Sequence, residues 1–251
     1  MSDTPADQFR RSDEEAARRG HPSYVWRAGP ERRLAMVRQW ARLEGARILD
    51  DGCGVGMYTA RFCQFSPHVA GLEIDPAVAE EARTRTNAEI AVGRGEDLPF
   101  DDKSFDVVFS HEVIEHVNDD HASAQEMLRV AARGGRIVLF APNRLYPFET
   151  HGHYWRGRYH FGNTPLINWL PDPLRNRLAP HVRAYTGPGL RGLFGEQAVR
   201  LIHHSVVYPG FDNVVATRPA AGQVLRRVLY TLEHTPMQTF GLSHFLVLER
   251  Q

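Results

Sequence analysis

The stretch R-I-L-D-D-G-C-G-V-G-M-Y-T-A-R, residues 47–61, decides the fold of this chain of 251 residues. A short apolar run comes first, three glycines follow at alternate positions, and a helix-compatible segment over residues 57–65 comes next. Glycine accepts positive φ angles and carries no Cβ, so the backbone of such a turn can approach a ligand closely. The helix that leaves the turn begins with unpaired N–H groups, which attract polar or anionic ligands. The pattern therefore predicts a strand, a ligand-binding turn and a helix, with the turn built on Gly52, Gly54 and Gly56.

The glycine spacing distinguishes between two kinds of nucleotide cofactor. A dinucleotide fingerprint has the spacing G-x-G-x-x-G, and here the third glycine comes one residue early, with Met57 in the expected position. The string L-D-D-G-C-G-V-G instead resembles the first motif of the class I S-adenosylmethionine-dependent methyltransferases. Asp51 departs from that motif, which mostly has an apolar residue at this position.

Two later segments carry the same resemblance. H-V-A-G-L-E-I-D-P is similar to the family's second motif and predicts a strand that ends near Glu73, whose carboxylate can accept hydrogen bonds from both ribose hydroxyls. G-R-G-E-D-L-P-F resembles the family's adenine-binding segment, but Arg94 stands where the family usually has aspartate. The adenine amino group then needs another acceptor, which Glu96, Asp97 or the backbone must supply.

The L-P-F-D-D-K-S-F-D-V-V string that follows completes the resemblance. On these motifs the chain is identified as a member of the class I methyltransferases, in the group of type 11 domains and ubiquinone-pathway O-methyltransferases. The resemblance implies S-adenosyl-L-methionine as the cofactor. It assigns cofactor binding to ten residues: Asp50, Gly52, Cys53, Gly54, Gly56, Glu73, Ile74, Gly95, Glu96 and His111.

Strand and helix signals alternate along the chain, with helices expected over residues 31–43, 57–65, 77–86, 122–132 and 220–232. This alternation predicts an α/β fold with a doubly wound, mostly parallel, seven-stranded Rossmann-like sheet and a ligand at the carboxyl ends of the strands. The resemblance implies that the last strand, residues 243–250, runs antiparallel.

The expected domain organisation has three parts. Residues 1–30 form an N-terminal arm or cap, and residues 31–251 form the methyltransferase domain. Within it, residues 144–180 are dense in aromatic, histidine, arginine and proline residues, which predicts an inserted substrate lid after the fifth strand. A packed surface subdomain is the alternative.

Charge and composition exclude several kinds of partner. Thirty basic residues balance thirty acidic ones, and Arg156 with Arg158 is the only local basic cluster, so a nucleic-acid partner is not indicated. No run of eighteen apolar residues and no signal peptide occur, and the two cysteines suit a reducing compartment. We expect a cytoplasmic protein without a membrane span that acts on a small-molecule acceptor. The oligomeric state is not indicated.

Candidates for the acceptor chemistry follow the fourth strand, in the string H-E-V-I-E-H-V. On a helix, Glu112, Glu115 and His116 would share one face, at i, i+3 and i+4. Two carboxylates and an imidazole suit Mg²⁺ or Mn²⁺ better than Zn²⁺. The string resembles two metal-using groups, the ubiquinone-pathway O-methyltransferases and the small-RNA 2′-O-methyltransferases, and in the second group a fourth ligand matches His181. Such an ion would lower the pKa of an acceptor hydroxyl and hold it toward the methyl group.

Two alternatives to a metal site remain open. Without a metal, His116 or His181, with Glu112 nearby, would orient or deprotonate the acceptor. The same residues can also cap a helix and anchor a loop without any chemical role. His151 and His153 alternate in the predicted lid, so they are either substrate contacts on one face or ordinary polar residues.

The predicted function is O-methylation of a small or medium-sized organic acceptor, namely a phenol, a quinone precursor or a sugar hydroxyl. One alternative is a non-catalytic relative that binds the cofactor and uses residues 144–180 as a protein interaction surface. The other is a nicotinamide-dependent oxidoreductase, which the glycine spacing disfavours.

Overall fold

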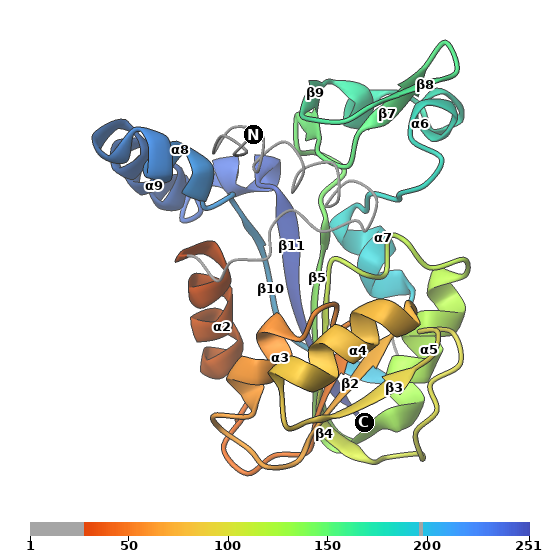
Figure 1. The fold of residues 1–251 in the computed structure, drawn as a ribbon. Helices are drawn as coiled ribbons and strands as arrows, with labels where there is room; N and C mark the ends of the chain where they lie inside the picture. The colour runs from red at the N-terminus through yellow and green to blue at the C-terminus, as the bar shows by residue number, and fades with distance from the viewer. Residues whose placement is uncertain (1–27, 196–197) are drawn as a thin grey trace, which may run out of the picture.

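A seven-stranded sheet runs through the centre of the molecule (Figure 1). The computed structural model describes residues 28–195 and 198–251, so the predicted arm over residues 1–30 lies almost wholly outside the described residues. The strand order is β10-β11-β5-β4-β1-β2-β3. The strands are β1 (Ile48–Asp51), β2 (Val69–Glu73), β3 (Glu89–Val92), β4 (Phe105–His111), β5 (Ala131–Pro142), β10 (Val199–Val207) and β11 (Ser243–Arg250).

The strand directions confirm the predicted topology. β1 pairs in parallel with β2 and β4, β2 with β3, and β4 with β5. β11 is antiparallel to both of its neighbours, β5 and β10, as predicted for the last strand. The order of the strands reverses between β1 and β4, and ligands of doubly wound sheets bind at such a switch point.

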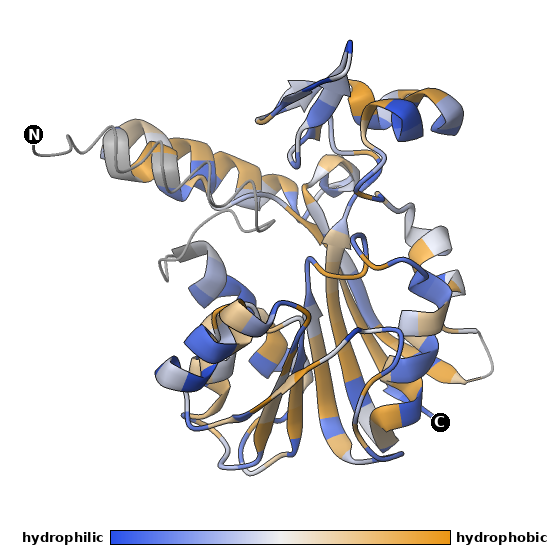
Figure 2. Cartoon of the chain, turned by 45° about the vertical axis from the view of Figure 1, so that its right-hand side comes forward, coloured by the Kyte–Doolittle hydropathy of each residue, from blue (hydrophilic) through white to orange (hydrophobic). Residues whose placement is uncertain are grey.

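Helices cover both faces of the sheet. One face carries α2 (Ala28–Trp40), α3 (Met57–Phe62) and α4 (Pro76–Arg85), and the other carries α5 (Asp120–Val130) and α7 (Gly187–Gly192). Successive residues of β1 point to opposite faces, so Ile48 packs in the cluster with Val37 of α2, and Leu49 packs in the cluster with Met127 of α5. Figure 2 shows the resulting hydrophobic strands. The ends of the helices differ from the predicted ones by three residues at most.

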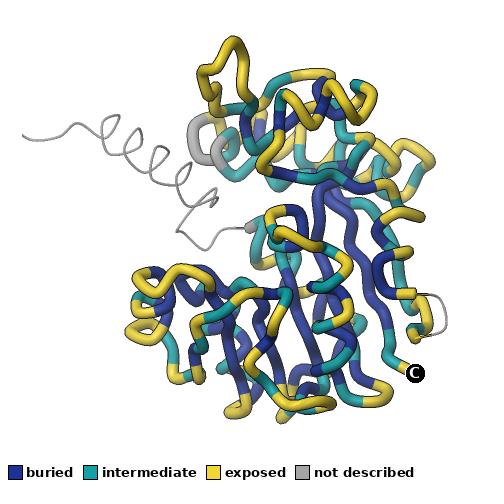
Figure 3. The backbone as a smooth tube through the Cα atoms, turned by 90° about the vertical axis from the view of Figure 1, so that its right-hand side faces the viewer, coloured by how far each residue is buried: buried dark blue, intermediate teal, exposed yellow. Residues whose placement is uncertain are grey.

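Residues 144–180 form a small subdomain at the carboxyl end of β5, with much of its surface exposed (Figure 3). Glu149 and Arg175 hold it together through a buried ion pair of 3.1 Å, with 2% of each side chain exposed. Its position fits the predicted lid, and its role over an acceptor stays a prediction. Its elements are β6 (Phe148–Glu149), β7 (His153–Trp155), β8 (Arg158–His160), β9 (Thr164–Pro165), η1 (Ile167–Trp169) and α6 (Asp172–Leu178).

A second projection lies between β10 and β11 (Figure 1). It consists of α8 (Asp212–Thr217), α9 (Pro219–Leu232) and η2 (Pro236–Phe240). Neither this projection nor any other described part of the chain contains a helix that is both long and apolar enough to span a membrane.

Candidate cofactor and acceptor site

The glycine turn joins β1 to α3 at the carboxyl edge of the sheet. Gly52, Gly54 and Gly56 have φ angles of 77°, 54° and 80°, a conformation that residues with a Cβ rarely adopt. A Cβ on Gly52 would lie 2.3 Å from a methyl group of Val113, so the turn has no room for a side chain there. The turn therefore has the conformation that the sequence predicted for close backbone contact with a ligand.

Glu73 ends β2 beside this turn. Its Oε2 accepts a hydrogen bond from the Gly54 N–H at 3.0 Å, and its Oε1 accepts one from the Asp75 N–H at 3.0 Å. A carboxylate has about four acceptor positions, so positions remain for the hydroxyls of a ribose. Ile74 is 60% exposed next to it and offers an apolar surface suited to an adenine ring.

Two residues of the predicted cofactor set support the turn from the core side. The Asp50 carboxylate is buried and accepts a hydrogen bond from Thr59 Oγ1 of α3 at 2.5 Å, and burial raises the pKa of Asp50 to about 7. The Cys53 sulfur lies against Gly71, so this side chain packs in the core and only its backbone can face a ligand. Burial also raises the pKa of the Cys53 thiol, which makes it an inert cysteine.

The loop predicted to hold the adenine is anchored by Glu96. Its Oε1 accepts hydrogen bonds from the backbone N–H groups of Asn118 and Asp119 at 2.6 and 3.4 Å, at the start of α5. Asp97 is exposed, and its backbone N–H donates to the Arg94 carbonyl at 3.1 Å. Because Glu96 is engaged, the Asp97 side chain and the loop backbone are the better candidates for an adenine contact.

Asp51, the departure from the first motif, lies on the α5 face of the sheet. Its side chain is buried, and neither carboxylate oxygen has a hydrogen-bond partner among the described residues. A Cβ on Gly95 would lie 3.5 Å from Asp51 Oδ1 and 3.2 Å from the buried hydroxyl of Ser123. Burial, together with the negative charge of Asp50, raises the pKa of Asp51 to about 7.

The end of β4 brings in a residue that the motifs did not indicate. Arg33 of α2 donates a hydrogen bond to His111 Nε2 at 2.7 Å, and its guanidinium lies 5.4 Å from the centre of the Phe140 ring. The Tyr58 ring lies 5.0 Å from the His111 ring. Helix α2 therefore covers the sheet edge next to the glycine turn. No sequence signal singled out Arg33, because an arginine on an amphipathic helix is usually a solvated surface residue.

The prediction that Glu112, Glu115 and His116 share one face of a helix is wrong. Residues 112–116 form a turn, and Glu112 has a φ angle of 55°. The Glu112 N–H still bonds to the Phe140 carbonyl of β5 at 3.0 Å, so the chain extends the sheet here instead of starting a helix. Glu112 Oε1 accepts a hydrogen bond from Ser243 Oγ at 2.7 Å.

A different trio of side chains converges at this turn. The Nε2 atoms of His116 and His151 each lie 3.9 Å from Glu115 Oε1, and His151 comes from the subdomain over residues 144–180. Burial and the negative charge of Glu112 raise the pKa of Glu115 well above its usual value. Burial, aided by repulsion from His151, lowers the pKa of His116 to about 4. Sequence alternation had marked His151 only as one of two candidate substrate contacts.

His181 lies beside this trio but does not point into it. Its Nε2 is 3.2 Å from the backbone carbonyl of His151, and its ring packs edge-on against the rings of Tyr154 and Tyr159. Its own carbonyl lies 3.3 Å from His116 Nδ1. His181 therefore positions the neighbouring histidines.

Comparison with known proteins identifies the domain. Residues 49–139 match the family model Methyltransf_11, described as a methyltransferase domain. The chain is 34% identical over 111 residues to a demethylmenaquinone methyltransferase of Clavibacter sepedonicus, which covers 43% of this chain and 45% of that protein. It is 34% identical over 105 residues to a probable S-adenosylmethionine-dependent methyltransferase of Mycolicibacterium smegmatis, covering 41% of each chain.

This chain contains a methyltransferase domain over residues 49–139, which confirms the predicted resemblance to the class I S-adenosylmethionine-dependent methyltransferases. Its fold agrees with the crystal structure of such a methyltransferase from Mesorhizobium loti, with a TM-score of 0.61 at 18% identity over 87% of this chain and 96% of the other. The chain spans less than half the length of the curated relatives to which it is similar.

The family match covers the predicted cofactor side of the site and part of the predicted acceptor side. Residues 49–139 include the glycine turn, Glu73 and the pair Glu115 and His116. His151 and His181 lie beyond the matched region. All the cofactor residues predicted from the motifs therefore lie within the matched region, and two of the four acceptor-side residues lie outside it.

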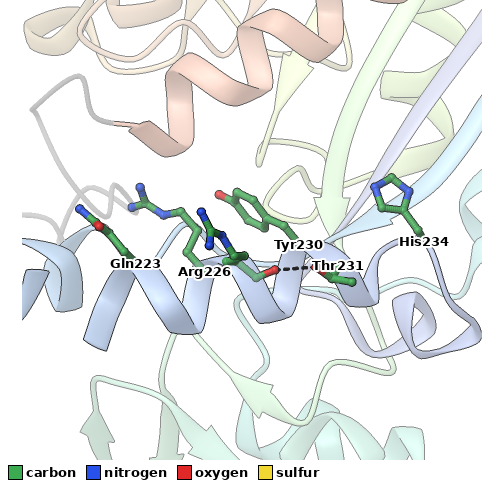
Figure 4. Close-up of a pocket in the computed structure, with 6 residues that line it drawn as sticks. Gln223, Arg226, Tyr230, Thr231 and His234 are labelled. Atoms are coloured by element: carbon green, nitrogen blue, oxygen red, sulfur yellow. Dashed lines mark hydrogen bonds between the residues drawn. The ribbon is translucent and has the colours of Figure 1, made fainter. Parts of the chain in front are cut away.

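A hollow of about 440 Å³ lies elsewhere on the methyltransferase, along α9 (Figure 4). None of the predicted site residues lines it. It is an open surface depression lined by Gln223, Arg226, Arg227, Tyr230, Thr231 and His234.

Proposed function

We propose that this methyltransferase transfers a methyl group to an oxygen atom of a small or medium-sized organic acceptor, namely a phenol, a quinone precursor or a sugar hydroxyl. The convergence of Glu115, His116 and His151 at the sheet edge that carries the glycine turn supports this proposal. β4 leads into this trio, and its hydrogen-bonded neighbour β1 leads into the glycine turn. Groups that can accept a proton thus adjoin the expected position of a methyl donor.

S-adenosylmethionine supplies an electrophilic methyl group on a sulfonium centre. The glycine turn and Glu73 fit this cofactor, because the turn exposes backbone and the carboxylate retains free acceptor positions. The remaining task of the chain is to align the acceptor oxygen and remove its proton.

His116 is suited to take that proton. Its Nδ1 faces the His181 carbonyl, so Nε2 keeps its lone pair, and the lowered pKa keeps the ring neutral at pH 7. As the new bond between oxygen and carbon forms, the bond between sulfur and carbon breaks, and the hydroxyl proton passes to Nε2. Glu112 and His181 stay candidates for orienting the acceptor.

The subdomain over residues 144–180 suits an acceptor with an aromatic or other flat ring. The rings of Tyr154 and Tyr159 flank His181 next to the proposed base. Closure of this segment over the site would exclude water from the reaction. Its aromatic character is the reason for preferring a phenol, a quinone precursor or a sugar over a large polyanionic substrate.

Calorimetry with S-adenosylmethionine, followed by a screen of phenols, quinols and sugars with methyl-labelled cofactor, tests this function. We expect heat of binding, and label on an acceptor oxygen. His116→Ala should lower kcat by about 100-fold or more with unchanged cofactor affinity. A folded chain that gives no heat at high cofactor concentration overturns the proposal. Heat without label transfer to any acceptor favours the non-catalytic cofactor-binding relative that uses residues 144–180 as an interaction surface.

A further inference from the structure

The Glu115 carboxylate lies where two histidine rings meet. Its side chain is fully buried, and neither oxygen has a hydrogen-bond partner among the residues that the structure describes. The Nε2 atoms of His116 and His151 both lie 3.9 Å from the same oxygen, which is too far for a hydrogen bond. One ligand atom from each of the three residues lies within 4.8 Å of the other two.

The hydrogen bonds of the other ring nitrogens fix which atoms face Glu115. His116 Nδ1 lies 3.3 Å from the His181 carbonyl, which can only accept, so this nitrogen carries the proton. His151 Nδ1 lies 3.1 Å from Glu149 Oε1, and an ionised carboxylate also only accepts. In their neutral forms both rings therefore turn an Nε2 lone pair toward Glu115. Two Nε2 lone pairs and a carboxyl oxygen that converge in this way are the donor atoms that a cation requires.

We propose that Glu115, His116 and His151 form a divalent-cation site. Two imidazole nitrogens and one carboxylate oxygen leave other coordination positions open, and they suit a transition ion such as Zn²⁺, Mn²⁺ or Fe²⁺ better than Mg²⁺. Bonds of about 2.1 Å to the ion place neighbouring ligand atoms roughly 3.0–3.4 Å apart, so a small movement of the side chains completes the site.

The second ring nitrogen of His151 has a carboxylate partner, as metal-binding histidines usually do. Glu149 accepts the hydrogen bond from His151 Nδ1, and Arg175 fixes Glu149 through the buried ion pair. A carboxylate on the second ring nitrogen orients a histidine ligand and raises its basicity. His151 is therefore held in position by the subdomain itself.

This site differs from the four-ligand set that the sequence resemblance implied. Glu112 is bonded to Ser243, and His181 Nε2 faces the His151 carbonyl, so neither joins the trio. His151 takes the place of His181 and Glu112 drops out, so the donor set changes from two oxygen and two nitrogen ligands to one oxygen and two nitrogen ligands. Because His151 belongs to the subdomain over residues 144–180, the ion also links that subdomain to the turn after β4. An ion on His116 Nε2 would occupy the lone pair that accepts the proton in the proposed function, so the two roles belong to the ion-bound and the ion-free site respectively. Any role of the ion in holding an acceptor oxygen rests on the proposed function.

Co²⁺ binding to the full chain tests the site, after EDTA treatment and without cofactor or acceptor. We expect one Co²⁺ per chain with visible ligand-field absorption, and competition by Zn²⁺ and Mn²⁺ in calorimetry. His151→Ala and Glu115→Gln should weaken Co²⁺ binding by about 100-fold or more, and Glu149→Gln by about 10–100-fold. His160→Ala, the matched control, removes an exposed histidine of the same subdomain and should retain the affinity within about threefold.

His151→Gln is measured beside His151→Ala, to distinguish the loss of a metal ligand from unfolding of the variant. Co²⁺ should raise the midpoint of thermal unfolding for the wild-type chain and for neither of these variants. A wild-type chain that binds none of the three ions at one per chain overturns the proposal, and so does an equal loss of affinity in His160→Ala. Because the binding assay contains no cofactor, its failure is distinct from a failure of methyl transfer.

Discussion

Replacing Asp51 with asparagine should stabilise the chain, and the gain should grow with pH. The carboxylate is buried without a hydrogen-bond partner among the described residues, and its pKa is raised from 3.8 to about 7. Because the pKa is higher in the folded state, that state binds more protons than the unfolded state between about pH 4 and pH 7. The free energy of unfolding therefore falls as the pH rises through this window.

The size of the effect follows from the shift. A pKa difference of about three units corresponds to about 4 kcal/mol, which is lost in full at about pH 8. At about pH 5 only about 1–2 kcal/mol has been lost, because this pH lies only about one unit above the pKa in the unfolded state. Asparagine keeps the shape and removes the charge. Asp51→Asn should therefore gain about 1–2 kcal/mol in free energy of unfolding at about pH 5 and about 4 kcal/mol at about pH 8.

Urea denaturation followed by circular dichroism between about pH 5 and pH 8 measures this gain. Asp106→Asn is the control, because Asp106 is exposed and its hydrogen bond with Arg47 lowers its pKa. That variant should change the stability by less than about 1 kcal/mol, with no gain at high pH. An equal gain for Asp51→Asn at both ends of the pH range would refute the titration argument. No gain at all would mean that the carboxylate is satisfied by a bound water.

Three further predictions use the site and the subdomain. Glu73→Gln should weaken S-adenosylmethionine binding by about 10–100-fold in calorimetry, since it removes a charged hydrogen-bond acceptor; unchanged affinity would exclude the ribose role. Gly52→Ala should lower the free energy of unfolding by more than about 2 kcal/mol in urea denaturation, because a Cβ there clashes and the φ angle is positive. Gly134 has a similar φ angle but open space around it, so Gly134→Ala should lower the free energy of unfolding by only about 1 kcal/mol. Equal costs would contradict the steric argument. Arg175→Met should lower the free energy of unfolding by about 3–5 kcal/mol, because it leaves the Glu149 carboxylate buried without its cation. A loss under about 1 kcal/mol would show that His151 is a sufficient partner for Glu149.

The sheet was predictable because each of its strands carries a strong local signal. β1 and β2 are buried along their whole length, and each ends in an acidic residue followed by a turn. The handedness of the connections then leaves few topologies. The ends of the helices were less accurate, since the last turn of a helix depends on contacts that the local sequence does not contain.

The cofactor side of the site was predictable for a physical reason. Its residues belong to one continuous stretch and the next strand, and the hydrogen bond between Glu73 and the Gly54 N–H joins the two motifs directly. The spacing of these residues along the sequence therefore predicts how they lie relative to one another in the structure. The burial of Asp51 without a partner did not follow from the pattern, which showed only that the residue is unusual there.

The acceptor side was not predictable from spacing. The string E-V-I-E-H-V has helical periodicity, but the bond from the Glu112 N–H to Phe140 keeps the backbone in the sheet. His151 and Arg33 reach the same edge from segments far away in the sequence. Only tertiary packing brings such residues together, so a local pattern carries no information about them.

The position of β11 constrains how the protein is made. Residues 243–250 pair with β5 on one side and β10 on the other. Until β11 has been synthesised, one edge of β5 stays unpaired and β10 has no strand with which to pair. The five strands from β3 to β5 can assemble first, and that intermediate presents an unpaired strand edge to other nascent chains. A message cut short before codon 243 would therefore yield a chain prone to aggregation, even though every residue of the glycine turn had been translated.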